Sequence, residues 1–442
     1  MKDLIVNRYV KNLLAVFFIM VFLFTRSFMG LYIFGFRIGE LAILSTMMVL
    51  ILYVVNLRKD QIFDNFKDTN FDKLVILILA SFVFIAVYSR SSFLNPYTYK
   101  ASSYIWALGF FFLGYMIFEK YKLNRYYVFL FLPILIYIYL LAIYDLPYSI
   151  QEFILSISDK YEPHKGSDIL LMFVVTFFVF LRINENKRVA LEILILFSAL
   201  YLPLLLYKSR AAFIALGIYF LIELFNLRKN LLNSSLYRNI GLLIITLLVG
   251  IQSIFLVTKS GIIKISETET KISQVAKHRA PELKPDEYVN YLFIRDNRFY
   301  STDVNINWRI QIWQDVFQDI AKENLYIVGH GYSEKIPAMS ALDHQGNSVR
   351  SGLDGMNENV HNYIVNLYAR GGIIHILLFA LFYYYLVRKH KANTGSYGSL
   401  TLIIPVMFAS FFDASMENSH FPLIFYFVLG MILNEKKIFE SN

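Results

Sequence analysis

Three basic side chains stand out among long apolar runs, and their types suit anion binding and proton transfer. They are Arg210, Arg309 and His361, in a chain that has only eight histidines. Guanidinium groups bind phosphate or carboxylate oxygens through paired donors. A histidine can take a proton from a hydroxyl group near neutral pH. Together the three would hold an anionic leaving group and activate an attacking hydroxyl.

Arg210 follows Ser209 in YKSRAAFIAL, between two apolar runs that leave almost no loop. Ser209 is a suitable N-cap for the second run, whose free N–H groups and positive dipole end favour an anion. Arg210 would add a planar set of donors to that site. The alternative is an arginine that only reaches out to the membrane interface.

Arg309 lies in NWRIQIWQDVFQDI, where apolar residues recur at helical spacing. The apolar stripe that follows it consists of Ile312, Trp313, Val316, Phe317 and Ile320. This spacing predicts an amphipathic helix with Arg309 at the head of its apolar stripe. A half-buried arginine needs an anionic partner, either a structural Asp or Glu or a bound anion.

His361 follows residues 357–359, Asn-Glu-Asn, which are suitable caps for a helix that begins there. That helix would lie along the outer interface and break at Gly371–Gly372, before the next apolar run. The alternative for His361 is a plain interfacial residue. Arg370 is nine positions along, about 180° around a straight helix, so it need not face the same target.

The elements that must position these residues are apolar. Of 442 residues, 57% are hydrophobic and only 17% are charged, and the mean hydropathy is +0.50. Long apolar runs recur from end to end, so we expect an all-α polytopic membrane protein. The first run, LLAVFFIMVFLF, has no small-residue cleavage site after it, so we expect an uncleaved span. The lack of cysteine excludes disulfides, thiolate metal sites and cysteine nucleophiles.

The apolar runs predict about 12 transmembrane helices, since a bilayer crossing needs about 20 apolar residues. The expected spans are 12–30, 39–56, 73–89, 103–119, 126–145, 168–183, 189–207, 211–227, 240–258, 366–387, 397–414 and 421–434. Basic segments fall on alternate sides of these spans. One side holds 21 Lys and Arg, against eight on the opposite side outside the long loop, counting Arg26 near the end of the first span. By the positive-inside rule, both termini are cytoplasmic. The same loops account for the net charge of +9, so no nucleic acid partner is expected.

One connection is much longer than the others. Residues 259–360 form a polar segment that would face outward as a large periplasmic loop. The stretch SETETKISQVAKHRAPELKPDEY within it is predicted to be flexible, and the amphipathic helix follows. The expected organisation is therefore an N-terminal bundle of about nine spans at 1–258, the loop at 259–360, and C-terminal transmembrane helices at 361–442.

All three candidates lie on the predicted outer side, and this set suits transfer of a sugar from a lipid diphosphate. The arginines would bind the diphosphate and His361 would remove a proton from the attacking hydroxyl. Neither a cofactor nor a metal is expected, because the loop histidines have no metal-ligand spacing. Four further candidates are secondary: Lys208, Arg370, Asp413 and Glu417. The two acidic ones, in FFDASMENSHF, would balance the arginines or contact sugar.

The ordered pieces SRAAFIALGIY (209–219), WRIQIWQDVFQDIAKENLYIVGHGY (308–332) and VHNYIVNLYARGGIIHILLF (360–379) resemble the superfamily of O-antigen ligases and O-antigen polymerases. The resemblance implies about twelve spans in a bacterial inner membrane and a donor glycan on undecaprenyl diphosphate. Arg210 and Arg309 match that family's diphosphate-binding arginines, and His361 matches its proposed base. The acceptor would be another lipid-linked glycan, lipid A core or protein.

A second class of function stays open, namely a transporter or flippase for lipid-linked glycans that does no chemistry. Buried charge within the spans would favour it. The acidic residues inside the predicted spans are few, and they are isolated or close to span ends. A transporter should keep its function when His361 is changed conservatively, whereas a transferase should not.

Overall fold

The protein is described here by a computed structural model, which covers residues 8–56, 69–120, 125–157, 164–232, 235–279, 291–340, 350 and 358–435. Within these ranges the chain is helical apart from two short antiparallel hairpins. The hairpins are β1 (Tyr32–Ile33) with β2 (Phe36–Arg37), and β3 (Leu292–Arg295) with β4 (Arg298–Ser301). The all-helical fold class expected from the apolar runs is therefore confirmed.

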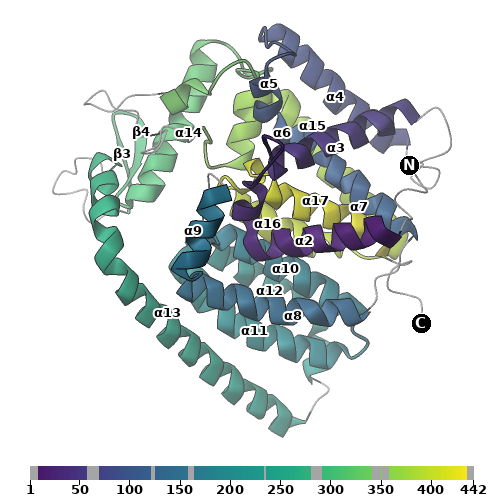
Figure 1. The fold of residues 1–442 in the computed structure, drawn as a ribbon, viewed down its shortest axis with the longest axis vertical. Coiled ribbons are helices and arrows are strands. Elements are labelled where there is room, and N and C mark those ends of the chain that lie inside the picture. Colours follow the sequence, from purple (N-terminus) through teal and green to yellow (C-terminus); the bar gives the residue numbers. More distant parts are fainter. Residues whose placement is uncertain are drawn as a thin grey trace.

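The helices follow one another with short connections in most of the chain (Figure 1). The first half contains α2 (Arg8–Met29), α3 (Ile38–Asn56), α4 (Thr69–Tyr88), α5 (Pro96–Ala101), α6 (Ser103–Trp106), α7 (Leu108–Lys120), α8 (Arg125–Tyr144), α9 (Tyr148–Ile157), α10 (Gly166–Ile183) and α11 (Lys187–Lys208). The second half contains α12 (Arg210–Leu232), α13 (Leu236–Arg279), α14 (Val304–Lys322), α15 (Tyr363–Thr394), α16 (Ser399–Ser410) and α17 (His420–Ile432). Two 3₁₀ turns, η1 (Pro337–Ser340) and η3 (Ser415–Glu417), lie in the connections between α14 and α15 and between α16 and α17.

Among the described residues, seven helices are long and apolar enough to cross a membrane. The number rises to eight if the end of α8 and α9, which are bent by 97°, count as one span. Four shorter apolar helices, Lys73–Tyr88, Ser103–Glu119, Ser399–Ser410 and His420–Ile432, coincide with the remaining predicted spans. Each predicted span thus has a helix, although length and composition alone identify only seven or eight.

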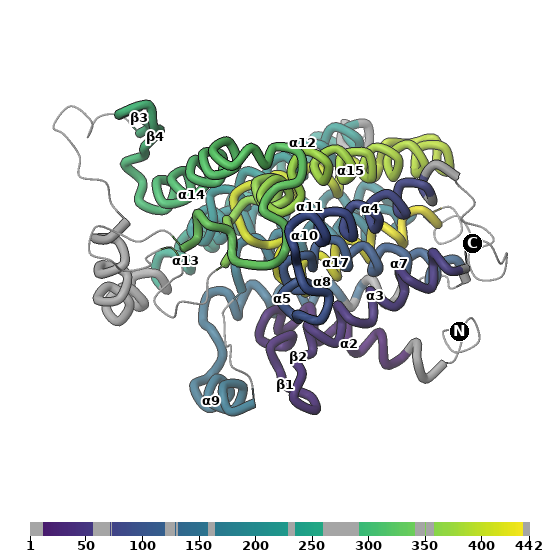
Figure 2. The backbone as a smooth tube through the Cα atoms, turned by 90° about the horizontal axis from the view of Figure 1, so that it is seen from above, coloured from purple at the N-terminus to yellow at the C-terminus, as the bar shows by residue number. Residues whose placement is uncertain are grey.

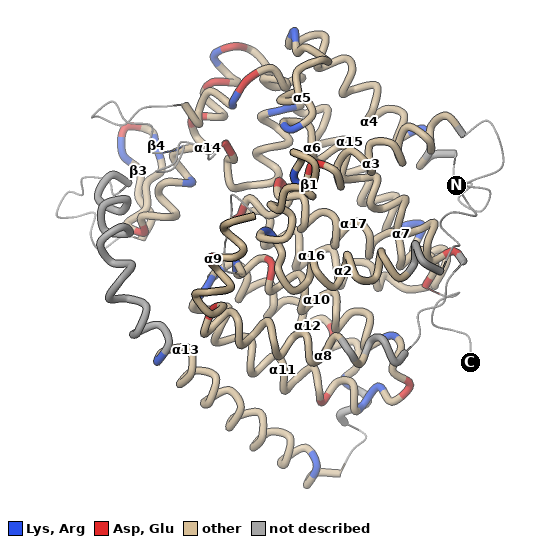
Figure 3. Tube along the Cα trace, in the orientation of Figure 1, with Lys and Arg blue, Asp and Glu red and all other residues tan. Residues whose placement is uncertain are grey.

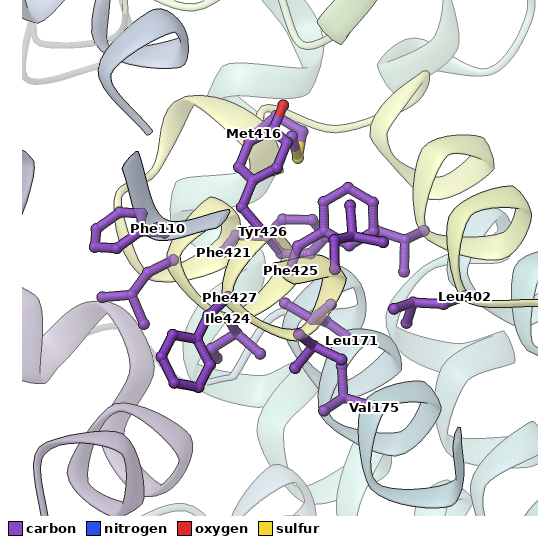
Figure 4. Close-up of a cluster of buried hydrophobic side chains, with 14 of the residues drawn as sticks. Phe110, Leu171, Val175, Leu402, Met416, Phe421, Ile424, Phe425, Tyr426 and Phe427 are labelled. Atoms are coloured by element: carbon purple, nitrogen blue, oxygen red, sulfur yellow. The ribbon is translucent and has the colours of Figure 1, made fainter. Parts of the chain in front are cut away.

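The core is centred on α17, whose residues from His420 to Ile432 are all buried. Figure 4 shows its aromatic and aliphatic side chains meeting those of neighbouring helices. A Cβ atom at Gly430 or at Gly114 of α7 would overlap the backbone of the opposite helix, at Phe111 and Phe427 respectively. Small residues at this contact let the two backbones approach closely, as is common between membrane helices.

The predicted amphipathic helix is present as α14, but its buried stripe differs from the expected one. Asp303 caps the helix by accepting hydrogen bonds from the Asn305 and Ile306 amides. The buried apolar positions are Trp308, Ile312, Val316 and Ile320. Trp308 therefore heads the stripe in place of Arg309, and Phe317 is 49% exposed. The stripe packs on residues from η1 and from both sides of residue 361: Ile336, Ala338, Met339, Val360, Val365 and Ala369.

Part of the loop that was predicted to be flexible is helical, because α13 continues to Arg279. The rest of that stretch, residues 280–288, lies outside the described residues. The helix after His361 also begins later than expected. Its first residue is Tyr363, and Asn362 is the N-cap, whose side chain accepts a hydrogen bond from the Val365 amide. The proposed cap at Asn357 lies outside the described residues.

The break predicted at Gly371–Gly372 is present as a kink inside α15. Gly372 has φ 58° and ψ −157°, which is not helical. The turn at Ile327–Gly331, within the stretch IVGHGY, packs into this kink. Backbone hydrogen bonds join His330 N to Ala369 O at 2.7 Å and Ile373 N to Tyr326 O at 2.9 Å. The glycine-rich turn therefore serves to fix the direction of α15.

The elements that carry the candidate site gather at one end of the bundle. Figure 2 shows the β3–β4 hairpin and α14 at the left, α9 at the lower left and the β1–β2 hairpin nearer the middle, all away from the ends of α4, α7 and α15 on the right. Lys, Arg, Asp and Glu lie mainly near the two ends of the helices, and the stretch between is almost free of them in Figure 3. This distribution is the one expected of helices that cross a bilayer.

Candidate functional site

Arg210 is the first residue of α12, and its side chain extends outward to α14. Ser209 precedes it as the predicted cap, and its hydroxyl accepts a hydrogen bond from the Ala212 amide at 3.3 Å. The guanidinium donates from Nη1 to Asp303 Oδ2 at 3.0 Å and to the Tyr291 hydroxyl at 3.1 Å. The side chain is 66% exposed. Arg210 thus holds an acidic side chain yet remains open to solvent.

Arg309, one turn into α14, is much less accessible. Burial lowers the pKa of its guanidinium, while the negative charges of Asp413 and Asp303 raise it. Its Nε atom is buried and has no hydrogen-bond partner among the residues that the structure describes. Asp303 therefore interacts with both arginines: it is hydrogen-bonded to Arg210 and electrostatically coupled to Arg309. The charge of one carboxylate thus acts on both predicted anion-binding residues.

His361 lies just outside α15, two residues before its first helical residue. Its φ of 54° is in the left-handed region, which is uncommon for a side chain of this kind. The imidazole packs edge-on against the Trp308 ring, with the centroids 4.9 Å apart. Its Nδ1 atom is 4.0 Å from Asp413 Oδ1. The ring is therefore placed between α14 and the loop that joins α16 to α17.

A second tryptophan of α14 supports this backbone. The Trp313 indole Nε1 donates a hydrogen bond to the carbonyl of Val360 at 2.8 Å. Asn362, on the other side of His361, is fixed as the cap of α15. The unusual backbone conformation of His361 is thus held from both flanking residues.

Asp413 is the residue at which the candidates meet. One of its oxygens is 4.0 Å from His361, and its charge acts on Arg309. The other oxygen accepts a hydrogen bond from the Ser167 hydroxyl at 2.5 Å. The Ala414 amide also donates to Oδ1, at 2.8 Å. One fixed carboxylate thus lies close to the histidine and acts electrostatically on an arginine.

Arg370 is not part of this group. It is 4% exposed and donates to the Gly331 and Glu334 carbonyls, at 3.0 and 2.6 Å. It also donates to the Tyr97 hydroxyl at 3.2 Å. These contacts hold the loop after the glycine-rich turn against α15, so Arg370 connects elements here.

The other two secondary candidates are Lys208 and Glu417. Lys208, in the last turn of α11, is half-buried, and its charge acts on His164. Glu417, at the end of η3, has both carboxyl oxygens buried. Burial raises the pKa of Glu417 to about 8; the charge of Arg370 lowers it and that of Asp413 raises it.

Several polar residues near the site were not identified from the sequence. They are Tyr291, Asp303, Trp308, Trp313, Ser167 and the pair formed by Asp168 and His420, whose Oδ1 and Nε2 atoms are 2.8 Å apart. Asp303 could have been found as the cap of the amphipathic helix, since an acidic residue there precedes the apolar stripe. The others depend on contacts between distant segments, for which the sequence holds no local signal.

Comparison with known proteins places this geometry in context. Residues 193–380 match a family model described as O-antigen ligase. The match includes Lys208, Arg210, Arg309, His361 and Arg370, while Asp413 and Glu417 lie beyond its end. The comparison with curated proteins gave no match. The resemblance read from the three sequence pieces is confirmed over this region.

Proposed function

We propose, from the premise that residues 193–380 are an O-antigen ligase region, that the protein is a membrane glycosyltransferase. It would move a glycan from undecaprenyl diphosphate to an acceptor hydroxyl on the periplasmic side of a bacterial inner membrane. The observation that carries this proposal is the arrangement around Asp303 and Asp413. These carboxylates bring together Arg210, Arg309 and His361, all of which lie within the matched region.

The proposed topology follows from the helices and the charge pattern. Twelve spans would include the four shorter apolar helices, and both termini would be cytoplasmic. Residues 1–258 would form the N-terminal bundle, 259–360 the periplasmic loop with α14, and 361–442 the C-terminal helices. This orientation puts α14, the two hairpins and α9 on the outer side.

In the proposed step, the acceptor hydroxyl oxygen bonds to the anomeric carbon of the donor sugar. The bond from that carbon to the diphosphate oxygen breaks, and its electron pair stays on the diphosphate. The hydroxyl proton passes to His361, whose protonated ring is stabilised by Asp413 at 4.0 Å. Diphosphate is a good leaving group, so neither a strong general acid nor a metal is needed.

The two arginines have different tasks in this proposal. Arg210 is exposed, so it can exchange its bond to Asp303 for a phosphate oxygen of an arriving donor. Arg309 is already largely removed from water, where a charge acts more strongly on a nearby anion. Arg309 would therefore stabilise the charge that grows on the diphosphate as the bond breaks.

The acceptor decides between a ligase and a polymerase. A ligase would transfer the chain to lipid A core or to protein, and a polymerase to another lipid-linked repeat. Mass spectrometry of the surface glycan from a deletion strain separates the two. Single repeats still attached to the surface would indicate a polymerase, whereas full-length chains left on the lipid carrier would indicate a ligase.

Purified protein in lipid vesicles tests transfer against transport. The glycolipid extract of the deletion strain supplies both donor and acceptor. We expect new glycosidic product and released undecaprenyl diphosphate. If labelled donor only changed leaflet, with no product formed, a transporter would be the correct interpretation.

A further inference from the structure

The loop between α16 and α17 carries a second carboxyl group that the proposed reaction does not use. Glu417 follows Asp413 by four residues and closes η3. Asp413 faces His361 and Arg309, so this short loop lies at the candidate site. Glu417 is thus placed beside the site by the same loop that positions Asp413.

The Glu417 carboxyl is in an unusual state for a buried acidic group. Both oxygens are buried, and neither has a hydrogen-bond partner among the residues that the structure describes. Buried polar groups are normally satisfied, and an unsatisfied one costs about 1–3 kcal/mol. Such groups in native structures often mark a place that a ligand or water fills.

The charges around Glu417 do not supply that partner. Arg370 of α15 acts on it electrostatically but forms no ion pair with it within the described part of the chain, and its nitrogens donate to other groups. Asp413 repels it. The helices α6 and α17, which also pack against η3, each carry a titratable ring that already has a partner. These are Tyr104, bonded to His375, and His420, bonded to Asp168.

A buried carboxyl without a cationic partner is more stable when protonated. Burial raises the pKa of Glu417 to about 8, with Arg370 opposing and Asp413 reinforcing the shift. The group is therefore neutral at pH 7, with one O–H donor and one free C=O acceptor. The O–H donor and the C=O acceptor of the neutral acid can both hydrogen-bond to hydroxyl groups of a sugar. A neutral acid also does not repel the negative charge of a nearby diphosphate.

We propose that Glu417 is a neutral carboxylic acid that binds hydroxyl groups of the acceptor sugar and so positions it before His361. The inference rests on the proposed function, because it takes the acceptor to be a glycan. It adds a binding role that depends on the acid being protonated. Donor binding by the arginines does not depend on it.

Infrared difference spectroscopy of the purified full-length protein in vesicles tests the protonated state directly. We expect the C=O stretch of a protonated carboxylic acid at pH 7, lost as the pH rises through about 8 and absent in Glu417→Gln. Adding the deletion-strain glycolipid extract should shift the band to lower frequency, as hydroxyl groups bind. A missing band at pH 7, or a band that the extract does not move, would overturn the inference.

Transfer assays with the same extract test the role of Glu417. Glu417→Gln keeps a neutral donor and acceptor, so it should keep most of the rate and lose the decline above about pH 8. Glu417→Ala should raise the half-saturating extract concentration about tenfold, the value of one hydrogen-bonding group. Glu152→Gln, at an exposed site on α9, is the matched control. If Gln and Ala behaved alike, the inference would be wrong.

The proposed transfer activity and the proposed role of Glu417 can be disproved independently of each other. Absence of any transfer by the wild-type protein would contradict the proposed function. The infrared response to the extract would still decide whether Glu417 binds glycan hydroxyls.

Discussion

At the level of single residues, we assign proton removal to His361 and charge stabilisation to Arg309. Asp413 Oδ1 is 4.0 Å from His361 Nδ1, and the charge of Asp413 also acts on Arg309. We expect His361→Ala to lower the transfer rate about 10²- to 10⁴-fold, the usual contribution of a general base. Donor binding should be nearly unchanged, because the arginines hold the diphosphate. Rates and donor affinity of purified protein check both statements.

Two comparisons sharpen this prediction. His361→Gln should be no better than Ala, because an amide cannot take the proton. His375 is the matched histidine: it is fully buried in α15 and bonded to Ser81 and Tyr104. His375→Gln should affect thermal stability more than turnover. Near-normal turnover in His361→Gln, or loss only on substitution of His375, would contradict the assignment of the base.

A further prediction at this scale concerns the charge that balances the diphosphate. If the arginines supply it, transfer should proceed in EDTA at an unchanged rate, and Arg309→Lys should be slower than wild type. Lysine keeps the charge but not the planar set of donors. Restoration by added Mg²⁺ or Mn²⁺ of activity that EDTA had abolished would show that arginine is not the sole charge stabiliser.

The candidate residues were predictable from the sequence, but their partners were not. Arg309 and His361 were visible as charged residues in apolar surroundings, and Arg210 as a cation at a helix start. The surroundings of Asp413 depend on contacts with α10, α14 and the start of α15, which are far apart in the chain. No local pattern encodes such contacts, so Asp413 was recognised only as a secondary candidate.

At the level of elements, the kink in α15 connects the glycine-rich turn to the site. Gly372 combines a backbone conformation that is essentially confined to glycine with direct contact to the backbone at Ile327. We expect Gly372→Ala to destabilise the protein by about 2–6 kcal/mol, since strain and overpacking each cost about 1–3 kcal/mol. Thermal unfolding in detergent, together with yield, measures this.

Alanine substitutions at two other glycines distinguish the effect of backbone strain from that of overpacking. Gly217, inside α12, has no positive φ, and a Cβ atom added there would have no neighbour within 4 Å, so Gly217→Ala should be neutral or slightly stabilising. Gly395 has φ +76° but open space, so Gly395→Ala should show strain alone. A Gly372→Ala variant as stable as Gly217→Ala would contradict the role of the kink.

The sequence predicted that these helices exist more reliably than it predicted where they begin and which residues they bury. The helix after His361 begins at Tyr363 because Asn362 is the residue whose side chain reaches the Val365 amide. Several residues before it are equally good caps by type, so sequence alone cannot choose. Phe317 was assigned to the buried stripe of α14 by spacing, yet it is 49% exposed and packs on the Tyr368 ring at 5.4 Å.

At the level of the whole molecule, hydropathy located the helices correctly. It does not establish which of these helices cross the membrane. Four of the predicted spans correspond to apolar helical stretches of only 10–17 residues. One of them, α17, is buried along its entire length by neighbouring helices. Its apolar composition thus reflects protein packing as much as contact with lipid. Length and composition cannot distinguish these two causes, which is why the count must be tested by experiment.

The orientation of the bundle gives the last prediction, and the sequence makes it easy to test. The chain has no cysteine, so a single introduced thiol is the only reactive one. Leu94 precedes α5 and is 94% exposed, at the end that carries α14, while Tyr397 lies between α15 and α16 and is 53% exposed. The positive-inside pattern puts the first outside and the second in the cytoplasm.

A membrane-impermeant maleimide should therefore label Leu94→Cys in intact spheroplasts, and Tyr397→Cys only after permeabilisation. The unsubstituted protein is the blank, because it has no thiol. The reverse pattern would place Arg210, Arg309 and His361 on the cytoplasmic side and exclude a periplasmic transfer site. Labelling of both positions from outside would mean that an odd number of the helices between them cross the membrane differently from the proposed topology. Either result would change the proposed function, because the donor and the acceptor must meet these residues on the same side.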